Sequence, residues 1–314
     1  MRVLCHYELT PELTGLLKSR CADGIELLFC PESDTENFEA LLPSINVIWH
    51  VLKPITEAHI VKANALRLIQ KLGVGINTIA VEAARNRKIA VCNTPNANTR
   101  AVAEMTLLHI LSSLRQLPQM MQRAPRPSDW TIPAAYQNDL LELGGKTVGF
   151  VGFGAVPSLL AQWLTAMEVR VVYFSRTVKI GSPYQFLPLD ALLEVSDIVS
   201  VHVPLSRETE ALLDETRIMR MKAGAIIVNT ARGPVVAQKA LLSALKSGHL
   251  RSAGLDVFEQ EPPDENDPIF SASTLTATPH VAWLTRETLM RCFDVAFENL
   301  RRLNCAEPLL YRLV

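Results

Sequence analysis

Strand-sized apolar runs alternate with helical patterns along the chain, and this alternation constrains the fold more than any other feature. In the first third, each apolar run is bounded by polar or turn residues, and helical patterns such as Thr10–Lys18 and Val81–Asn86 lie between the runs. Such alternation is typical of an α/β protein with parallel sheets. The predicted strands here are Val3–Tyr7, Ile25–Cys30, Val47–Leu52, Leu66–Leu72 and Ile89–Asn93.

A second series of the same kind begins near Lys146, between two long helical patterns, Thr99–Arg115 and Thr285–Asn304. Because little chain follows the second of these helices, we expect it to pack back on the N-terminal part. This predicts a discontinuous first domain, residues 1–97 plus 285–314, with a second domain, residues 98–284, inserted in it. The predicted strands of the second domain are Thr147–Gly152, Val169–Ser175, Asp197–Val203, Ala225–Asn229, Ala253–Val257 and Leu275–Thr278, and its predicted helices include Ser158–Met167, Asp214–Met219 and Gln238–Ser247.

The balance of charge narrows the classes of partner. The 314 residues include 31 basic and 32 acidic ones, for a formal net charge of -1. Without a basic excess or a charge run, neither nucleic acid nor a membrane surface is expected as a partner, and a small-molecule enzyme is favoured.

The six cysteines are scattered without a C-x-x-C pair, which predicts free thiols rather than a zinc site or a disulfide framework. No signal peptide or membrane-spanning run is recognisable, so we expect a soluble, cytoplasmic protein.

A glycine-rich loop follows the first strand of the second series, in the sequence VGFGAVPSLLAQW. Gly152, Gly154 and Pro157 occupy the positions of a G-x-G-x-x-G fingerprint. Gly152 would allow the tight turn, and Gly154 would let the backbone approach a pyrophosphate at the start of a helix, where Ala155 and Val156 follow. An ordinary glycine turn between strand and helix is the alternative. Pro157 replaces the third glycine, but proline is tolerated in a first helical turn, so we expect dinucleotide binding with a slightly displaced helix.

The end of the next strand bears on which dinucleotide would bind. An acidic residue about 20 positions after the glycines normally bonds the ribose 2′-hydroxyl of NAD. Here Ser175 stands at that position and is followed by Arg176 and Thr177. A carboxylate would repel a 2′-phosphate, whereas a hydroxyl beside an arginine would bind one. The sequence therefore favours NADP(H), with NAD(H) possible if Arg176 is only a solvated loop residue.

Three later segments place polar residues at the ends of predicted strands, where ligands bind in open α/β sheets. They are NTARG, GLDVFEQEPP and TPHVAW, and they contain Arg232, Glu261 and His280. A 2-oxo acid requires a cation for its carboxylate, an acid for the developing alkoxide and a partner that orients this acid. The three residues supply these types. Singly, each has an ordinary alternative, as a surface ion pair, a solvated acid or a satisfied core histidine.

With these segments the chain resembles the D-isomer-specific 2-hydroxyacid dehydrogenase family. Further blocks carry the resemblance over nearly the whole chain: KLGVGIN, VCNTPNANTRAVAE, GGKTVGFVGFGAV, VSVHVPLSRETEALL and NTARGPVV. It implies a Rossmann-type nucleotide domain inserted in a flavodoxin-like substrate domain, usually as a homodimer. The proline-rich segment Leu117–Leu143 is interpreted either as a dimer arm or as a surface connection. Asn77 replaces a common aspartate, and Asn96 replaces a glycine at a place where asparagine tolerates positive φ.

The resemblance also implies roles for individual residues. His280 would be the acid/base, Glu261 would fix its tautomer, and Arg232 would bind the substrate carboxylate and polarise the carbonyl. The implied cofactor-binding residues are Gly152, Gly154, Ala155, Val156, Ser175, Arg176, Thr177, Val203, Pro204, Thr209, Thr230, Ala231, Arg232, Asp256 and His280. The implied substrate-binding residues are Leu52, Lys53, Val74, Gly75, Arg232, His280 and Trp283.

The function expected from these residues is NAD(P)H-dependent interconversion of a small 2-oxo acid, such as glyoxylate or hydroxypyruvate, and its D-2-hydroxy acid. One alternative is an NAD-linked dehydrogenase of the phosphoglycerate type, and a phosphite or formate dehydrogenase is another. A different class is a non-catalytic corepressor that keeps the fold and senses dinucleotide. The neutral charge and the absence of long disordered tails favour the enzyme.

Overall fold

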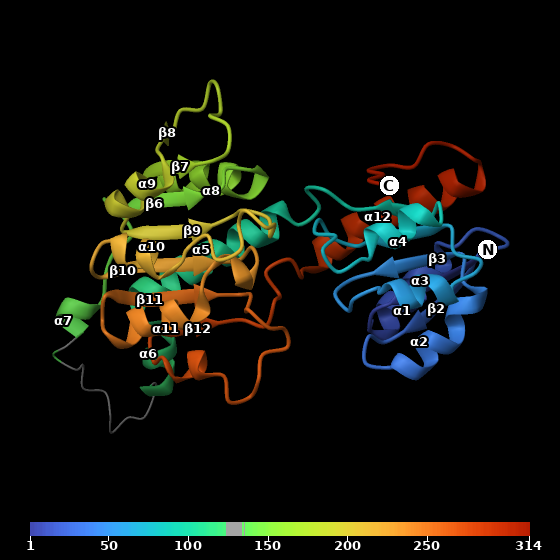
Figure 1. Ribbon diagram of the computed structural model, residues 1–314, viewed down its shortest axis with the longest axis horizontal. Coiled ribbons are helices and arrows are strands. Elements are labelled where there is room, and N and C mark those ends of the chain that lie inside the picture. The colour runs from blue at the N-terminus through green and yellow to red at the C-terminus, as the bar shows by residue number, and fades with distance from the viewer. Residues whose placement is uncertain (124–133, 135) are drawn as a thin grey trace. The chain divides into compact units, whose positions relative to one another are not determined.

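The computed structural model describes residues 1–123, 134 and 136–314, and the chain forms two compact units (Figure 1). Unit 1 consists of residues 1–98 and 284–314, and unit 2 consists of residues 99–283. Unit 1 is therefore discontinuous in sequence, with unit 2 inserted in it. In the part of the chain that the structure describes, no helix is long and apolar enough to cross a membrane.

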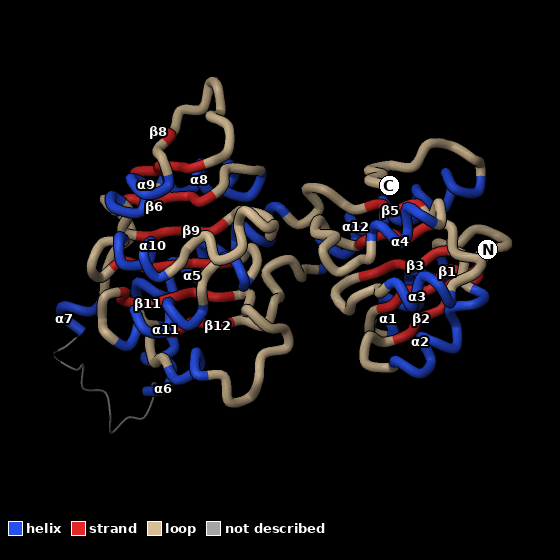
Figure 2. The backbone as a smooth tube through the Cα atoms, viewed as in Figure 1, coloured by secondary structure: helices blue, strands red, loops and turns tan. Residues whose placement is uncertain are grey.

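Unit 1 is built on a five-stranded parallel sheet with the order β2-β1-β3-β4-β5, which is the flavodoxin-like order (Figure 2). Every residue of β3 and β4 is buried, as expected for parallel strands covered on both faces. The strands are β1 (Arg2–His6), β2 (Glu26–Cys30), β3 (Val47–His50), β4 (Leu68–Lys71) and β5 (Ala90–Cys92). The helices are α1 (Pro11–Ser19), α2 (Thr35–Leu41), α3 (Glu57–Lys62), α4 (Val81–Asn86) and α12 (Arg286–Asn304), with a 3-10 turn at η1 (Leu42–Ser44).

Neighbouring residues of β3 show which helices cover which face of this sheet. Ile48 packs in a cluster with residues of α2, α3 and α4. Trp49 points to the opposite face, where its ring lies 5.6 Å from that of Phe293 and 5.1 Å from that of Phe297, both on α12. The alternation of side chains along one strand thus separates two helical layers.

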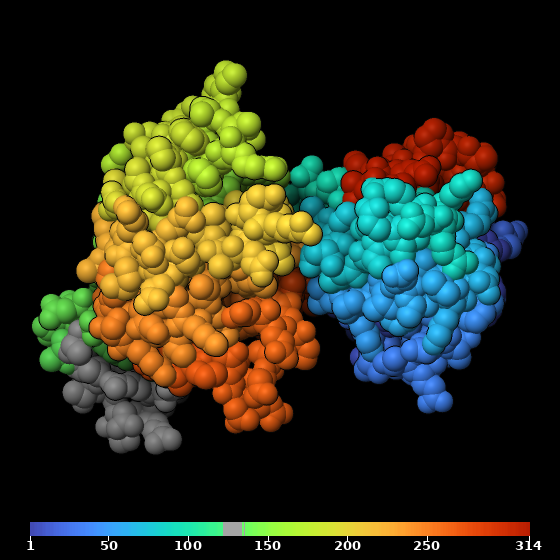
Figure 3. All heavy atoms as spheres, in the orientation of Figure 1, coloured from blue at the N-terminus to red at the C-terminus, as the bar shows by residue number. Residues whose placement is uncertain are grey.

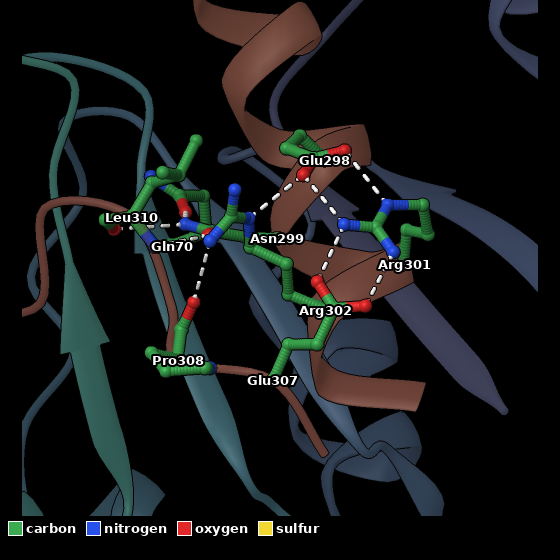
Figure 4. Close-up of polar contacts among 8 residues, drawn as sticks. All are labelled: Gln70, Glu298, Asn299, Arg301, Arg302, Glu307, Pro308 and Leu310. Carbon is green, nitrogen blue, oxygen red and sulfur yellow. Dashed lines mark hydrogen bonds and ion pairs between the residues drawn. The ribbon is translucent and has the colours of Figure 1, made fainter. Parts of the chain in front are cut away.

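The C-terminal tail of unit 1 returns to the edge of its sheet. The backbone N–H of Leu313 donates to Val91 of β5 at 2.8 Å, so the tail covers an otherwise open strand edge. The buried Asn299 of α12 fixes the turn before the tail: its amide donates to Gln70 Oε1 at 2.7 Å, and its Oδ1 accepts from Leu310 N at 2.7 Å. Figure 4 shows these contacts together with Arg301, which pairs with Glu298 within α12 and with Glu307 beyond the helix, and so joins α12 to the tail.

Unit 2 is built on a seven-stranded parallel sheet with the order β12-β11-β10-β9-β6-β7-β8. The first strand in sequence, β6, lies between β7 and β9, so the direction of winding reverses there, as in a Rossmann fold. The strands are β6 (Thr147–Val151), β7 (Arg170–Phe174), β8 (Gln185–Phe186), β9 (Ile198–Val201), β10 (Ala225–Asn229), β11 (Leu250–Leu255) and β12 (Leu275–Ala277). The helices are α5 (Thr99–Arg115), α6 (Leu117–Arg123), α7 (Tyr136–Asp139), α8 (Ala155–Ala166), α9 (Leu189–Val195), α10 (Glu215–Arg220) and α11 (Gln238–Lys246), with 3-10 turns at η3 (Gly233–Val235) and η4 (Pro268–Ser271).

Two apolar clusters cover the two faces of this sheet. One contains Ile110 and Leu114 of α5 together with Leu160 and Leu164 of α8. The other contains the buried residues of α9, α10 and α11. The order of the strands and these two layers confirm the predicted α/β class with parallel sheets.

Several predicted boundaries were wrong. Helix α8 begins at Ala155, three residues before the predicted Ser158, because Pro157 fits inside its first turn. Strand β11 covers Leu250–Leu255 rather than Ala253–Val257, since its first residues pair with β10 before the apolar run becomes continuous. The short edge strand β8 was not predicted, because two residues carry no periodicity. Of the segment Leu117–Leu143, residues 124–133 and 135 lie outside the described part, and its ends form α6 and α7.

Candidate active site

The glycine turn between β6 and α8 has the geometry that a dinucleotide requires. Gly152 has φ +97°, and a Cβ there would lie 2.6 Å from the carbonyl oxygen of His202. Only glycine fits this turn. Gly154 is the N-cap of α8, is exposed, and would have open space around a Cβ. The space beside Gly154, with the N–H groups of Ala155 and Val156 behind it, suits the close approach of an anion.

Pro157 does not damage the helix that it enters. It is the third residue of α8 and is buried. The first bond of the helical ladder runs from Ser158 N to Gly154 O at 3.0 Å, one residue later. The N–H that proline lacks therefore has no intrahelical partner in any case.

The segment after β7 is exposed and held mainly by its own atoms. Ser175 Oγ donates to the carbonyl of Thr177 at 2.6 Å, and Arg176 and Thr177 are exposed. The pKa of Glu208 is lowered by hydrogen bonds from the Ser206 hydroxyl and from its own backbone N–H. The charge of Arg176 lowers this pKa further. Arg176 therefore lies near the turn that follows β9.

That turn brings together other residues of the predicted cofactor set. Thr209 Oγ1 donates to Pro204 O at 2.6 Å and accepts from Ser206 N at 2.8 Å. Val203 lies against the glycine turn, since a Cβ on Gly152 would meet its Cγ1 at 2.9 Å. The glycine turn and the β9 turn are thus neighbours at the point where the strand order reverses, which is where ligands bind in open α/β sheets.

His280 and Glu261 form a close pair. His280 Nδ1 lies 2.6 Å from Glu261 Oε2, and the other oxygen of Glu261 accepts from Phe258 N at 3.0 Å. Burial raises the pKa of Glu261. The pKa is nevertheless held below its usual value by the hydrogen bond and charge of His280, then by the N–H of Phe258 and the charge of Arg232. The carboxylate form is favoured, which suits a partner of an imidazolium.

Arg232 stands beside this pair, after β10. Its Nη1 donates to Ala231 O at 2.6 Å. Burial lowers the pKa of the Arg232 guanidinium, and the negative charge of Glu261 opposes that shift. Asn229 shapes the turn: its Oδ1 accepts from Ala231 N at 3.0 Å and its Nδ2 donates to Arg232 O at 2.9 Å. Thr230 is buried, with its hydroxyl 2.9 Å from that of Thr106.

Asp256, predicted to lie near the nicotinamide, has a buried carboxylate that holds the His280 segment. It accepts from Thr278 Oγ1 at 2.6 Å, Val281 N at 2.9 Å and Ala282 N at 2.9 Å. His280 itself has φ +53°, which is uncommon for a residue with a Cβ, and its N–H donates to Asp256 O at 2.8 Å. Asp256 therefore fixes the backbone geometry of the segment that carries His280.

The predicted substrate-binding residues divide between the units. In unit 1, one oxygen of Glu32 accepts from Leu52 N and Lys53 N, each at 2.7 Å. The carbonyl of Val74, which precedes Gly75, accepts from Asn93 Nδ2 at 2.9 Å. In unit 2, Trp283 is buried and its Nε1 donates to His280 O at 3.1 Å.

Sequence reasoning missed several residues that set this geometry. Asn229 could have been found, because it precedes Thr230 at a strand end and its amide can bond in both directions. Glu32 gave no signal, since it lies about 20 residues before Leu52 and Lys53, whose N–H groups it accepts from. Asn96, expected to accept a positive φ, has φ +62°.

Taken together, unit 2 offers an imidazole paired with a carboxylate, a guanidinium beside them and a glycine turn open to an anion. This set can exchange a proton with an oxygen atom, bind a carboxylate and accept a dinucleotide. The glycine turn and the open space beside Gly154 fit a nicotinamide dinucleotide.

Comparisons with known proteins agree with this set. Residues 107–282 match the family described as D-isomer specific 2-hydroxyacid dehydrogenase, NAD binding domain. A glyoxylate reductase of Thermofilum pendens is 40% identical over 75% of this chain and 71% of its own length. A D-3-phosphoglycerate dehydrogenase of Archaeoglobus fulgidus is 34% identical over 96% of this chain but 56% of its own length. The crystal structure of an NAD-dependent formate dehydrogenase from Staphylococcus aureus in complex with NAD is 27% identical, with a TM-score of 0.89 over 100% of this chain and 99% of that chain.

The fold, the paired imidazole and carboxylate, and the match over more than half of the chain lead to one conclusion. The protein belongs to the D-isomer specific 2-hydroxyacid dehydrogenase family and is an NAD(P)-dependent oxidoreductase.

Proposed function

We propose that this enzyme reduces a small 2-oxo acid of the glyoxylate or hydroxypyruvate type to its D-2-hydroxy acid. The observation that carries the proposal is the His280–Glu261 contact of 2.6 Å with Arg232 beside it. An acid, its orienting carboxylate and a cation are the groups that a 2-oxo acid requires. The 40% identity to a glyoxylate reductase supports the choice of a small acid.

In the proposed mechanism, a reduced nicotinamide dinucleotide held at the turn of Gly152 and Gly154 would supply a hydride for the carbonyl carbon. His280 donates a proton to the carbonyl oxygen from Nε2, the ring nitrogen that is not paired with Glu261, so the C=O bond becomes CH–OH. Glu261 holds Nδ1 and stabilises the imidazolium before the transfer. Arg232 binds the substrate carboxylate and stabilises charge on the carbonyl oxygen. In the reverse direction, His280 takes the proton back.

The remaining predicted roles belong to the same proposal. Leu52, Lys53, Val74, Gly75 and Trp283 would contact the substrate. The N–H groups of the Val74–Gly75 loop suit its carboxylate, because the loop carbonyl of Val74 is already engaged by Asn93. Thr230 and Ala231 would line the cofactor together with the glycine turn. Asp256 would contribute chiefly through the segment that it holds.

We also propose that NADP(H) is preferred over NAD(H). Ser175 replaces the acidic residue that would repel a 2′-phosphate, and the exposed Arg176 offers a cation. Glu208, whose pKa is lowered in part by the charge of Arg176, would need to turn away from the phosphate.

The proposed assembly is a homodimer, for which Leu108, Leu111, Leu117 and Met121 on α5 and α6 provide exposed apolar side chains. Its proposed setting is the cytoplasm, where the six thiols stay free.

The test is oxidation of NADPH and of NADH by the purified enzyme with glyoxylate, hydroxypyruvate, pyruvate and 3-phosphohydroxypyruvate. We expect turnover with one of the small acids and NADPH. Turnover limited to the phosphorylated acid and NADH would instead support the phosphoglycerate-type alternative, which the 34% identity over 96% of the chain favours. Binding of dinucleotide without turnover of any acid would support the corepressor-like alternative.

A further inference from the structure

His109 is a buried histidine outside the catalytic set. It lies in α5, and its Nε2 is 3.0 Å from the hydroxyl of Thr278, just beyond β12. Thr278 Oγ1 is in turn 2.6 Å from Asp256 Oδ1. A buried imidazole costs free energy unless it forms hydrogen bonds. The bond to Thr278 satisfies Nε2, whereas Nδ1 is buried without a hydrogen-bond partner among the described residues.

A glycine in the adjacent strand makes room for this ring. A Cβ on Gly254 of β11 would lie 2.7 Å from His109 Cβ and 3.1 Å from its Nδ1. Glycine inside a strand weakens it, so such a residue normally marks a close approach. Two positions far apart in sequence are therefore matched to this contact.

The direction of this chain of hydrogen bonds follows from the carboxylate form of Asp256. Burial raises the pKa of Asp256, and the bonds from Thr278 Oγ1, Ala282 N and Val281 N oppose this shift. As a carboxylate, Asp256 can only accept, and it does so from these three donors. The single hydroxyl hydrogen of Thr278 is then used, so its oxygen accepts from His109 Nε2–H. Burial lowers the pKa of His109 to about 4, which agrees with a neutral ring that donates from Nε2.

Asp256 is also the residue that fixes the His280 backbone. Its carboxylate holds Val281 and Ala282, and its carbonyl accepts from His280 N at 2.8 Å. The left-handed φ of +53° at His280 persists only while its surroundings hold it. From this chain of contacts we propose that His109 is a positioning residue for His280, acting through Thr278 and Asp256. The inference rests on the proposed role of His280 as the acid.

The first experiment compares His109→Leu, which keeps the volume but removes the donor, with His109→Gln, whose amide nitrogen can replace Nε2. Loss of one neutral hydrogen bond should lower kcat by about 3- to 10-fold in His109→Leu, with the KM for NADPH unchanged. His109→Gln should recover most of kcat. The matched control is Ser112→Ala, because Ser112 Oγ joins the same helix to Thr276 of β12 at 3.3 Å without reaching Asp256. Ser112→Ala should keep the wild-type kcat.

A double-mutant cycle with Thr278→Val tests the route of the effect. If His109 acts through the Thr278 hydroxyl, His109→Leu should change kcat by less than about twofold in the Thr278→Val background. Additive losses, equal losses in His109→Leu and Ser112→Ala, or a His109→Gln variant as slow as His109→Leu would each overturn the proposal.

A spectroscopic readout separates this proposal from the proposed function. The imidazole Cε1–H signal of His280, assigned by its absence in His280→Ala, should shift in His109→Leu and return toward its wild-type position in His109→Gln. An unchanged signal in His109→Leu would overturn the positioning role even if kcat fell. If the wild-type enzyme turned over no 2-oxo acid, the proposed function would fail, and the His280 signal would still decide whether His109 positions this ring.

Discussion

Two loops of unit 2 differ sharply in how firmly the scaffold holds them. Segment 278–283, which carries His280, is fixed by three donors to the buried Asp256 and by the bond from Trp283 Nε1 to His280 O. Segment 175–181, after β7, has the local bond of Ser175, a bond from Lys179 N to Tyr173 Oη at 2.9 Å and a turn bond from Ser182 N to Lys179 O at 3.1 Å. Its tip is exposed at Ile180, and the space-filling view shows the yellow-green segment between β7 and β8 projecting from the surface (Figure 3).

This difference separates two tasks of the proposed enzyme. A group that transfers a proton must be held in place before the substrate arrives, because small displacements are costly to the rate. A group that only selects between two cofactors can lie on an exposed loop and adjust when the cofactor binds. We therefore expect substitutions in segment 278–283 to affect kcat, and those in segment 175–181 to affect cofactor preference alone.

The largest expected effect is at His280. Replacement of this residue by alanine removes the proposed acid, and kcat should fall by about 10²- to 10⁴-fold, the range of general acid catalysis. Binding of NADPH, followed by quenching of intrinsic protein fluorescence, should persist within about threefold, a change of less than 1 kcal/mol. A near-normal kcat in this variant would refute the assigned role and, with it, the distinction between the two loops.

Gly152→Ala should have the next largest effect, and it tests whether the glycine turn is held as firmly as segment 278–283. The φ of +97° and the carbonyl of His202 at 2.6 Å from a Cβ both oppose a side chain there. Unfolding free energy should fall by about 2 kcal/mol or more, measured by urea denaturation. Gly154→Ala is the control, since open space surrounds its Cβ: it should unfold like the wild type but bind dinucleotide more weakly. Equal stability of both variants would show that the glycine turn is as adjustable as segment 175–181.

Arg176→Ala tests the exposed loop itself. Removal of one charged contact to a 2′-phosphate should raise the KM for NADPH about tenfold and leave the KM for NADH and both kcat values unchanged. Arg170→Ala is the matched control, because it removes the same charge from the other end of β7, where Arg170 pairs with Gln185 at 2.9 Å. A fall in kcat with both cofactors would contradict the separation of the two tasks, and an unchanged KM for NADPH would contradict the proposed NADP(H) preference.

The contrast between the loops also explains how much could be predicted from the sequence. Local patterns sufficed for the strands of both sheets except β8, because periodicity records which residues face a core. Arg232, Glu261 and His280 could be found from motifs at strand ends, and the structure brings them together. The chain from His109 through Thr278 and Asp256 could not be found, since it joins residues up to 169 positions apart. The positive φ at His280 was missed for the same reason: it is imposed by Asp256 and not by the histidine's own neighbours.

The smallest expected effect is the contribution of Glu261 to stability, and its pH dependence has a definite sign. The pKa of Glu261 is held below its usual value in the folded protein, mainly by the hydrogen bond from His280 once burial is overcome. The stabilisation is therefore fully present above the unfolded pKa of about 4.3 and is lost as the pH falls through the lower folded value. Because the Glu261 side chain is 34% exposed, we expect at most about 1 kcal/mol between the wild type and Glu261→Gln. Urea denaturation at a series of pH values should show this difference constant just above pH of about 5 and shrinking toward about 3. A difference that grows as the pH falls would mean that Glu261 is held as the neutral acid, and His280 would then lack the negatively charged partner that the proposed acid requires.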